Sequence, residues 1–141
     1  MIDYLLCAPD EPTARADATL AAFYLAASWM SPGGWDGSCV IPSVQVWLDS
    51  GDVTTGTDPI TGQPIVTHSP LPGFWLVVSQ VQRNAALEAS PYLMLGADRD
   101  AASPTNTGIF VFGPGQSAAR FVGAHVSPTF AGSAYPFGAS A

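Results

Sequence analysis

A run of five apolar residues, Phe74-Trp75-Leu76-Val77-Val78, constrains the fold of this chain more strongly than any other segment. A strand that faces water on one side alternates apolar and polar residues, whereas a strand covered on both faces is apolar along its length. We therefore expect this run to be a central strand of a sheet with packed layers on both faces. Shorter apolar segments at residues 4–8, 92–95 and 109–112 predict further buried strands.

Residues 40–48 show the alternation of a strand with one buried face. Val44, Val46 and Leu48 occupy every second position, and Gln45 lies between the first two. This segment therefore predicts a strand that precedes the central one in the chain.

The segment after the first strand has the start and stop signals of a helix. Asp10 is a suitable N-cap, Pro12 lies in the first turn, and Ser31-Pro32-Gly33-Gly34 would stop a helix. We therefore expect the main helix over residues 10–29. The apolar residues that recur at helical spacing within it are Ala16, Leu20, Phe23 and Ala27, with Tyr24 beside them.

The order of these elements predicts an α+β fold. With a short second helix over residues 84–89, the chain follows the β-α-β-β-α-β order of ferredoxin-like folds. A small mixed sheet with another strand order is the alternative. Tyr4-Leu5-Leu6-Cys7-Ala8-Pro9-Asp10 resembles Tyr92-Leu93-Met94-Leu95-Gly96-Ala97-Asp98, as expected for adjacent inner strands, although so short a match also arises by chance.

Residues 49–72 are polar and rich in turn-forming residues, and they predict a hairpin that projects from the domain. Its tip would be Asp58-Pro59-Ile60-Thr61-Gly62, where Asp58 can cap the turn and Gly62 allows a positive φ. Residues 53–57 and 65–68 would form its two strands. Such a β-arm can pair with the sheet of a neighbouring molecule, and the alternative is a solvated loop without function.

From residue 113 onward Gly, Ala, Ser and Pro dominate, with aromatic residues at intervals. We therefore divide the chain into an α+β domain, residues 1–112, and an extended C-terminal segment, residues 113–141. A flexible segment with spaced aromatic residues can order along a partner. The alternative, that these residues fold back onto the chain's own sheet, is favoured for Phe121 and less so for Tyr135 and Phe137.

The charge content limits the partners of this domain. Charged residues make up 11% of the chain, against about 25% in an average protein, and apolar residues make up 48%. The chain can therefore fold, but its surface carries little charge, which favours a place inside an assembly. Its 11 acids outnumber four arginines, and there is no lysine. Four scattered cations cannot follow a phosphate backbone, so we expect no nucleic-acid partner.

No segment has the features of a targeting signal or a membrane span. The N-terminus carries Asp3 where a secretory signal needs positive charge, and the longest apolar stretch, residues 20–30, is shorter than the roughly 20 residues that cross a bilayer. We therefore expect a protein made in the cytoplasm, with no membrane partner. In that compartment Cys7 and Cys39 are expected to be free thiols, with a disulfide as the alternative.

The residues that usually carry chemistry form no recognisable motif. His68 and His125 lie in the predicted hairpin and in the C-terminal segment, and there is no Gly-x-Ser-x-Gly elbow to supply a nucleophile. The cysteines are too far apart for a zinc site. Asp49 and Asp52 lack the further acids of a calcium loop, and residues 113–117 lack the lysine of a phosphate-binding loop. We therefore predict no catalytic, cofactor-binding or metal-binding residue.

Three features lie within about residues 53–102: the hairpin tip, the segment Leu71-Pro72-Gly73-Phe74-Trp75-Leu76-Val77-Val78, and the short helix that leads into Tyr92-Leu93-Met94-Leu95-Gly96-Ala97-Asp98-Arg99-Asp100. In these features the chain resembles small structural or accessory proteins of tailed bacteriophages and prophages of GC-rich bacteria. The resemblance implies a virion component of the tail, baseplate or neck that acts through protein–protein contacts. It implies a location in the virion, with the cytoplasm as the alternative, and no catalytic residue.

These observations favour a non-enzymatic assembly protein that forms homo-oligomers and contacts other virion or assembly proteins. The candidate contact residues are Trp35, Trp47, Asp58, Thr61, Phe130, Tyr135 and Phe137.

Two other functions stay open. The first is a small module that binds a carbohydrate or a peptide through Trp35 and Trp47, because exposed aromatic rings can stack on sugars. The second is a small hydrolase-type enzyme. Its site would assemble from Asp49, Asp52, His68 and Asp98.

Overall fold

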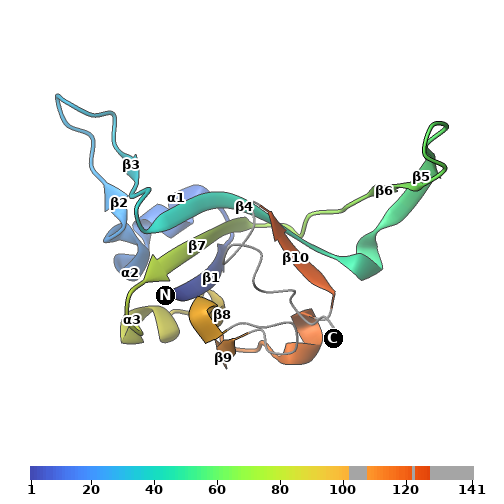
Figure 1. Cartoon of the computed structure of the whole chain (residues 1–141). Helices are drawn as coiled ribbons and strands as arrows, with labels where there is room; N and C mark the ends of the chain where they lie inside the picture. The colour runs from blue at the N-terminus through green and yellow to red at the C-terminus, as the bar shows by residue number, and fades with distance from the viewer. Residues whose placement is uncertain (102–107, 122, 128–141) are drawn as a thin grey trace.

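The computed structural model describes residues 1–101, 108–121 and 123–127 of the chain. The structure is mostly β, with 44% strand and 19% helix. Six strands form one antiparallel sheet that curls into a half-barrel, in the order β10-β4-β7-β1-β8-β9 (Figure 1). These strands are β1 (Ile2–Ala8), β4 (Val40–Leu48), β7 (Phe74–Gln80), β8 (Leu93–Asp98), β9 (Ile109–Phe112) and β10 (Ala124–Ser127). The helices are α1 (Glu11–Ala16), α2 (Ala18–Ala21) and α3 (Ala85–Glu88).

β7 is the central strand that the apolar run predicts. It pairs with β4 on one side and with β1 on the other, and its side chains alternate between two buried cores. Leu76 and Val78 belong to the core on the helix face, and Trp75 and Val77 belong to the core on the opposite face. Because both faces are covered, every position of the run can be apolar.

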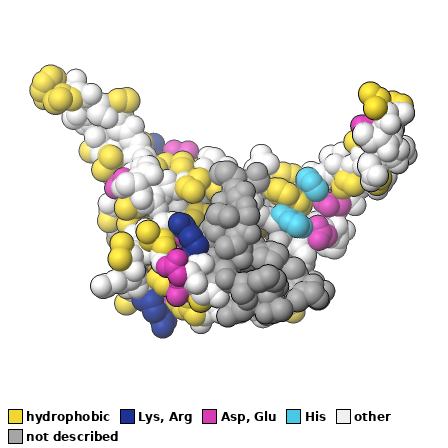
Figure 2. Space-filling view, viewed as in Figure 1, with side chains coloured by type: hydrophobic (Ala, Val, Ile, Leu, Met, Phe, Trp, Pro, Cys, Tyr) yellow, Lys and Arg dark blue, Asp and Glu magenta, His cyan; other side chains and the backbone are white. Residues whose placement is uncertain are grey.

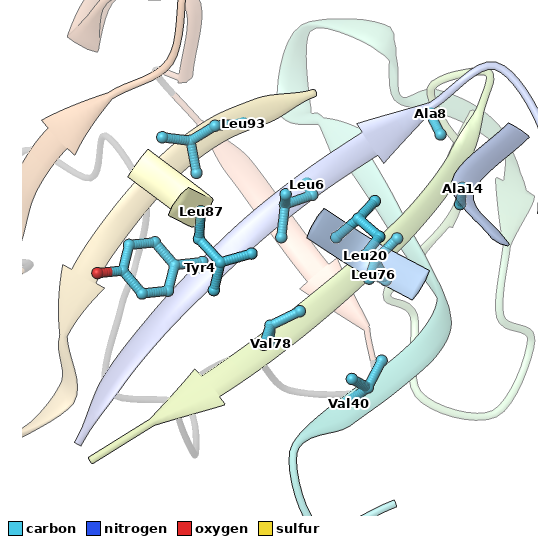
Figure 3. Close-up of a cluster of buried hydrophobic side chains, with 10 residues drawn as sticks. All are labelled: Tyr4, Leu6, Ala8, Ala14, Leu20, Val40, Leu76, Val78, Leu87 and Leu93. Carbon is cyan, nitrogen blue, oxygen red and sulfur yellow. The ribbon is translucent and has the colours of Figure 1, made fainter. Parts of the chain in front are cut away.

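The core on the helix face is shown in Figure 3. Ala14 of α1, Leu20 of α2 and Leu87 of α3 are fully buried against the sheet. The strand residues that they meet are Tyr4, Leu6, Ala8, Val40, Leu76, Val78 and Leu93. Each short helix is therefore held to the sheet by a single fully buried anchor.

The core on the opposite face is completed by residues after the last predicted strand. Phe121, in the 3₁₀ turn η3 (Ala118–Phe121), is buried and stacks on Phe112 with 6.0 Å between ring centroids. β10 then pairs with β4, and its Ala124 is buried in the same core. The fold-back of Phe121 is thus confirmed, and the extended segment expected from residue 113 does not begin there, because the chain belongs to the sheet through Ser127.

The predicted fold class is wrong. We expected an α+β domain with one main helix over a small mixed sheet in ferredoxin-like order. The structure instead has a curled antiparallel sheet of six strands and three small helices. The likeness of the segments that begin at Tyr4 and Tyr92 does reflect adjacent strands, because β1 and β8 pair along most of their length.

The main helix over residues 10–29 fails at Asp17. The Asp17 side chain accepts hydrogen bonds from the backbone N–H groups of Thr19 and Leu20, at 3.0 Å each, and its backbone is extended. Aspartate is a poor residue for a helix interior and a good N-cap, so α1 ends and α2 begins at this position. After α2 the chain leaves the body as a hairpin instead of continuing as a helix.

A β-bulge at Ser43 makes β4 change faces. Ser43 has a φ of 57°, and the pairing with β7 skips it, since Pro42 faces Leu76 and Val44 faces Trp75. Without the extra residue, Val40 and Val44 would share a face of the sheet. With it, Val40 joins the helix-face core and Val44 joins the opposite core. Bulges of this kind also increase the local twist, which suits a curled sheet.

Tyr4 fastens α3 to the sheet through a polar network. Its hydroxyl accepts a hydrogen bond from the Asn84 backbone N–H at 2.8 Å and donates one to Glu88 at 2.7 Å. Burial raises the pKa of Tyr4 to about 12, and the Glu88 carboxylate acts in the same direction. Glu88 also pairs with Arg83, and this hydrogen bond lowers the pKa of Glu88.

Cys7 and Cys39 are free thiols, both half-buried. Burial raises the pKa of Cys7, which leaves it less reactive than an exposed thiol. Over the described ranges, no helix has the length and apolar character needed to cross a membrane.

Candidate functional site: two projecting arms

Two hairpins project from the body, one from each side of the molecule as drawn in Figure 1. The first arm, residues 24–35, contains β2 (Tyr24–Leu25) and β3 (Gly34–Trp35). The second arm, residues 53–67, contains β5 (Val53–Thr57) and β6 (Pro64–Thr67). Each arm is a separate two-stranded antiparallel ribbon, not part of the six-stranded sheet.

Aromatic contacts fix the base of the first arm to the body. Tyr24 and Trp35 pair across the two strands, and their rings meet edge to face at 5.2 Å. Trp35 also stacks on Phe74 of β7, with 6.1 Å between centroids. On the other side, the Arg15 guanidinium lies 4.2 Å from the Tyr24 ring centroid. Contacts of these kinds are favourable beyond the area they bury, so the arm leaves the body in a defined direction.

The tip of the first arm exposes two large apolar side chains. Trp29 is 93% exposed and Met30 is 76% exposed. Hydrophobic side chains gather at this tip in Figure 2. Residues 18–35 carry no charged side chain, so the arm has no charged group that would favour contact of this surface with water. A tryptophan held almost entirely in water is unusual for a monomer and indicates a contact surface.

The tip of the second arm has the turn that the sequence predicts. The Asp58 side chain accepts hydrogen bonds from the N–H groups of Ile60 and Thr61, at 2.8 and 3.3 Å. Gly62 has a φ of 72°, a conformation that costs other residues energy, and its N–H donates to the Asp58 carbonyl at 2.8 Å. The turn therefore presents Ile60 outward, where it is 92% exposed.

The strands of the second arm are exposed on both faces. Every residue of β5 and β6 is solvent-exposed, including the apolar side chains Val53, Ile65 and Val66. An isolated two-stranded ribbon is marginally stable in water, and three or more strands or a packed layer are usually needed. The second arm therefore lacks a covering layer among the described residues of the chain.

A cluster of aromatic and titratable residues lies at the base of the second arm, and we call it the root cluster: Trp47, Asp49, Asp52, His68 and His125. The imidazoles of His68 and His125 both stack on the indole of Trp47, at 4.7 and 5.6 Å between centroids. Each imidazole also contacts an acid. His68 Nδ1 lies 2.8 Å from Asp52 Oδ1, and His125 Nε2 lies 2.7 Å from Asp49 Oδ1. In Figure 2 the histidines and acids lie together where the arm meets the body.

The structure separates the candidate contact residues into two groups. Asp58 and Thr61 lie at the tip of the second arm, as expected. Trp35 and Trp47 are half-buried, and other rings of the chain stack on both of them. The other three candidates, Phe130, Tyr135 and Phe137, lie outside the described residues.

The structure brings together three of the four residues of the enzyme alternative. Asp49, Asp52 and His68 meet in the root cluster, together with His125. Asp98 lies elsewhere, 4.0 Å from the N-terminal amino group. In the parts of the chain that the structure describes, no three His, Cys, Asp or Glu side chains are placed to hold a metal ion.

The exposed tip residues were missed by the sequence analysis. The sequence pattern places Trp29 at the end of a helix and gives Met30 no role, and it places Ile60 in the hairpin tip without making it a candidate contact residue. The signal that could have found the first tip is the Trp29-Met30 pair directly before Ser31-Pro32-Gly33-Gly34, because a turn of that composition brings its neighbours to the surface.

Comparison with known proteins yields no match to a family, to a curated protein or to a solved structure.

Proposed function

We propose that this protein is a non-enzymatic structural subunit that assembles with further copies of itself through its two arms. The observation that carries the proposal is the exposure of large apolar side chains at the arm tips. Trp29, Met30 and Ile60 are 93%, 76% and 92% exposed. An apolar patch exposed at the end of a hairpin becomes favourable when a partner covers it.

The charge distribution supports a second copy as that partner. The chain has a net charge of −7, so two bodies of this protein repel each other. The first arm carries no charged residue, and the second arm carries only Asp58, which caps its own turn. The arms are therefore the parts of the surface that a like-charged copy can approach at least cost.

The base of the first arm, together with the two helices before it, also offers a surface for an apolar tip to occupy. A hollow of about 640 Å³ lies at the base of the first arm. Its lining residues are Pro12, Arg15, Ala16, Ala21, Tyr24, Ala26 and Ala27. Because the arm tips and the hollow are different surfaces, contact between a tip of one copy and the hollow of another is head-to-tail, the arrangement that builds rings or filaments.

The size of the effect follows from the area of the tip side chains. A tryptophan buries about 150–250 Å² at an interface, which stabilises by about 4–6 kcal/mol at about 25 cal/mol per Å². Ordering costs reduce this to about 2–4 kcal/mol for a central aromatic residue. Loss of Trp29 from such a contact weakens association by about 30- to 700-fold.

A bacteriophage particle is the assembly that we propose for this subunit, in the tail, baseplate or neck. Support for this part comes from the resemblance within residues 53–102, which includes the tip of the second arm, and from the low charge of the chain. Such components are repeated by symmetry and work through protein–protein contacts, which suits a body with two contact arms.

Light scattering of the full chain over a range of concentrations tests the proposal. We expect a defined oligomer for the natural chain. We expect a shift toward monomer for Trp29→Ser combined with Met30→Ser, and separately for Ile60→Ser. Val81→Ser is the matched control, because Val81 is 81% exposed but lies on the body, between β7 and α3. A monomer at every concentration, or equal effects of the arm variants and the control, would contradict the proposal.

A carbohydrate-binding module is less well supported. The two tryptophans that would stack on a sugar, Trp35 and Trp47, are half-buried and stacked with other rings of the chain. Trp29 is the exposed tryptophan, but it lies at the end of a narrow hairpin that carries no charged side chain to orient a sugar.

A further inference from the structure

The hollow at the base of the first arm combines apolar walls with one positive charge. Alanines, a proline and the ring of Tyr24 line it, and among the described residues that line it only Arg15 is charged. The Arg15 guanidinium lies 4.2 Å from the Tyr24 ring centroid. A site of this composition fits a partner that presents an apolar side chain next to a carboxylate.

The acids close to Arg15 in the sequence do not pair with it. Asp10 caps α1, where its side chain accepts a hydrogen bond from the Thr13 N–H, and Asp17 caps α2. Glu11 lies one turn before Arg15 on α1, and in the described parts of the chain no ion pair joins Arg15 to it or to any other acid. A carboxylate for Arg15 can therefore come from another copy of the chain.

The tip of the second arm presents the complementary groups. Asp58 is the one charged residue within residues 53–67, and the exposed residues Pro59 and Ile60 follow it directly. The N–H groups of Ile60 and Thr61 both donate to Asp58 Oδ1, and no residue that the structure describes donates to Oδ2. Oδ2 can therefore accept a hydrogen bond from a guanidinium while Oδ1 still caps the turn.

The tip of the first arm suits the hollow less well. Trp29 and Met30 have no charged neighbour on their arm, so this tip offers Arg15 no carboxylate. The second arm also leaves the body on the side opposite to the first arm in the view of Figure 1. Copies lined up in one orientation therefore bring the second arm of each copy to the first arm of the next.

We propose that the tip of the second arm of one copy occupies the hollow of the next copy, with Ile60 against the alanines and Asp58 paired with Arg15. This inference rests on the proposed function, because it assigns the contact between the assembling copies. Each copy then offers one tip and one hollow, so assembly continues head to tail. The contact also brings the exposed strands β5 and β6 alongside the first arm, whose apolar tip they can cover.

Light scattering of two mixed variants of the full chain tests the proposal. Arg15→Glu damages the hollow and leaves the tip of the second arm intact, whereas Ile60→Ser damages that tip and leaves the hollow intact. Each variant alone should assemble at least about tenfold more weakly than the natural chain. An equal mixture should form pairs with one copy of each variant and grow no further, because one undamaged tip and one undamaged hollow remain.

Charge substitutions test the ion pair between the copies. Asp58→Asn removes the charge but keeps an oxygen that can cap the turn. It should weaken assembly of the natural chain by up to about fivefold, and it should strengthen assembly of the Arg15→Glu chain, where it removes a repulsion. Arg120→Glu is the matched control, because it changes the net charge equally at an exposed residue of η3 that does not line the hollow.

The outcomes separate this contact from the proposed function. If the natural chain assembles but the mixture stays monomeric, the contact is wrong and the proposed function stands. The same follows if Arg120→Glu weakens assembly as much as Arg15→Glu, because net charge then explains both. A natural chain that is monomeric at every concentration contradicts the function and the contact together. Circular dichroism confirms the fold of each variant before mixing, and Ala26→Glu, at another exposed residue of the hollow, is the second hollow variant.

Discussion

Replacing Tyr4 by phenylalanine should change both the stability of the domain and its response to alkaline pH. Tyr4 is fully buried in the core shown in Figure 3, and its hydroxyl joins the Asn84 N–H to the Glu88 carboxylate. The substitution keeps the ring but leaves both partners without their buried hydrogen bond. Such a loss costs about 1–3 kcal/mol, and α3 should be the element that loosens.

The pH response has a defined sign. Burial raises the pKa of Tyr4 to about 12 from an ordinary value of 10.0. A group whose pKa is higher in the folded state stabilises fully below its unfolded pKa, and that contribution is lost as the pH rises through the folded pKa. The natural chain should therefore lose about 2–3 kcal/mol of stability through Tyr4 between about pH 10 and pH 12. Tyr4→Phe has no such group to ionise.

Urea unfolding followed by far-ultraviolet circular dichroism measures this difference. At about pH 8 we expect the natural chain to be more stable than Tyr4→Phe by about 1–3 kcal/mol, and we expect this gap to close by about pH 12. Tyr24→Phe is the control, because it removes a hydroxyl outside the network. A gap that stays constant up to about pH 12, or no gap at about pH 8, would refute the buried hydrogen-bonded state of Tyr4.

Two further substitutions test the packing of the fold by the same unfolding assay. Leu20→Ala removes the fully buried anchor of α2 and should lower the free energy of unfolding by about 3–5 kcal/mol. Leu25→Ala, at an exposed position nearby, should lower it by less than about 1 kcal/mol. Equal losses would contradict the burial of Leu20. Gly96→Ala should destabilise by about 1–3 kcal/mol, because an added Cβ would lie 2.8 Å from Val111 Cγ1 and 3.0 Å from the Tyr4 ring. Gly37→Ala is its control, since nothing lies within 4 Å of the added atom, and a neutral Gly96→Ala would mean that the sheet is looser at this point.

Some parts of the fold follow from local residue chemistry, and these could be predicted. The apolar run at residues 74–78 indicates a strand covered on both faces, and β7 is such a strand. The tip of the second arm follows from Asp58 and Gly62, which form the expected cap and positive φ. In both cases the pattern is formed by residues that are close in the sequence, so it can be recognised without knowledge of the fold.

Other parts depend on competition between signals that sequence alone does not rank. Alanines and leucines favour a helix through residues 10–29, but the capping preference of Asp17 divides it, and Tyr24 and Trp35 gain more by pairing across a hairpin. The bulge at Ser43 could not be predicted either, because the residues next to Ser43 in the sequence give no signal for a positive φ. The number of strands in the sheet depended on β10, in a segment whose composition resembles a flexible tail.

The candidate site shows the same division. The second arm could be predicted from its turn, whereas the root cluster could not, because His68, His125 and Trp47 meet only through the pairing of β10 with β4. The exposure of Trp29 was not predicted, because the sequence pattern indicates a helix over residues 10–29. A residue's exposure is a property of the finished fold, and the strongest contact candidate was therefore found only in the structure.

The most direct test of the central claim is hydrogen exchange of both arms as the concentration of the full chain is raised. If copies of this chain assemble through their arms, peptides within residues 24–35 and 53–67 should become more protected in step with the solution mass. Peptides around Val81 on the body should not change. Arms that exchange equally fast while the mass rises would show that another surface makes the contact, and arms and mass that both stay constant would contradict self-assembly itself.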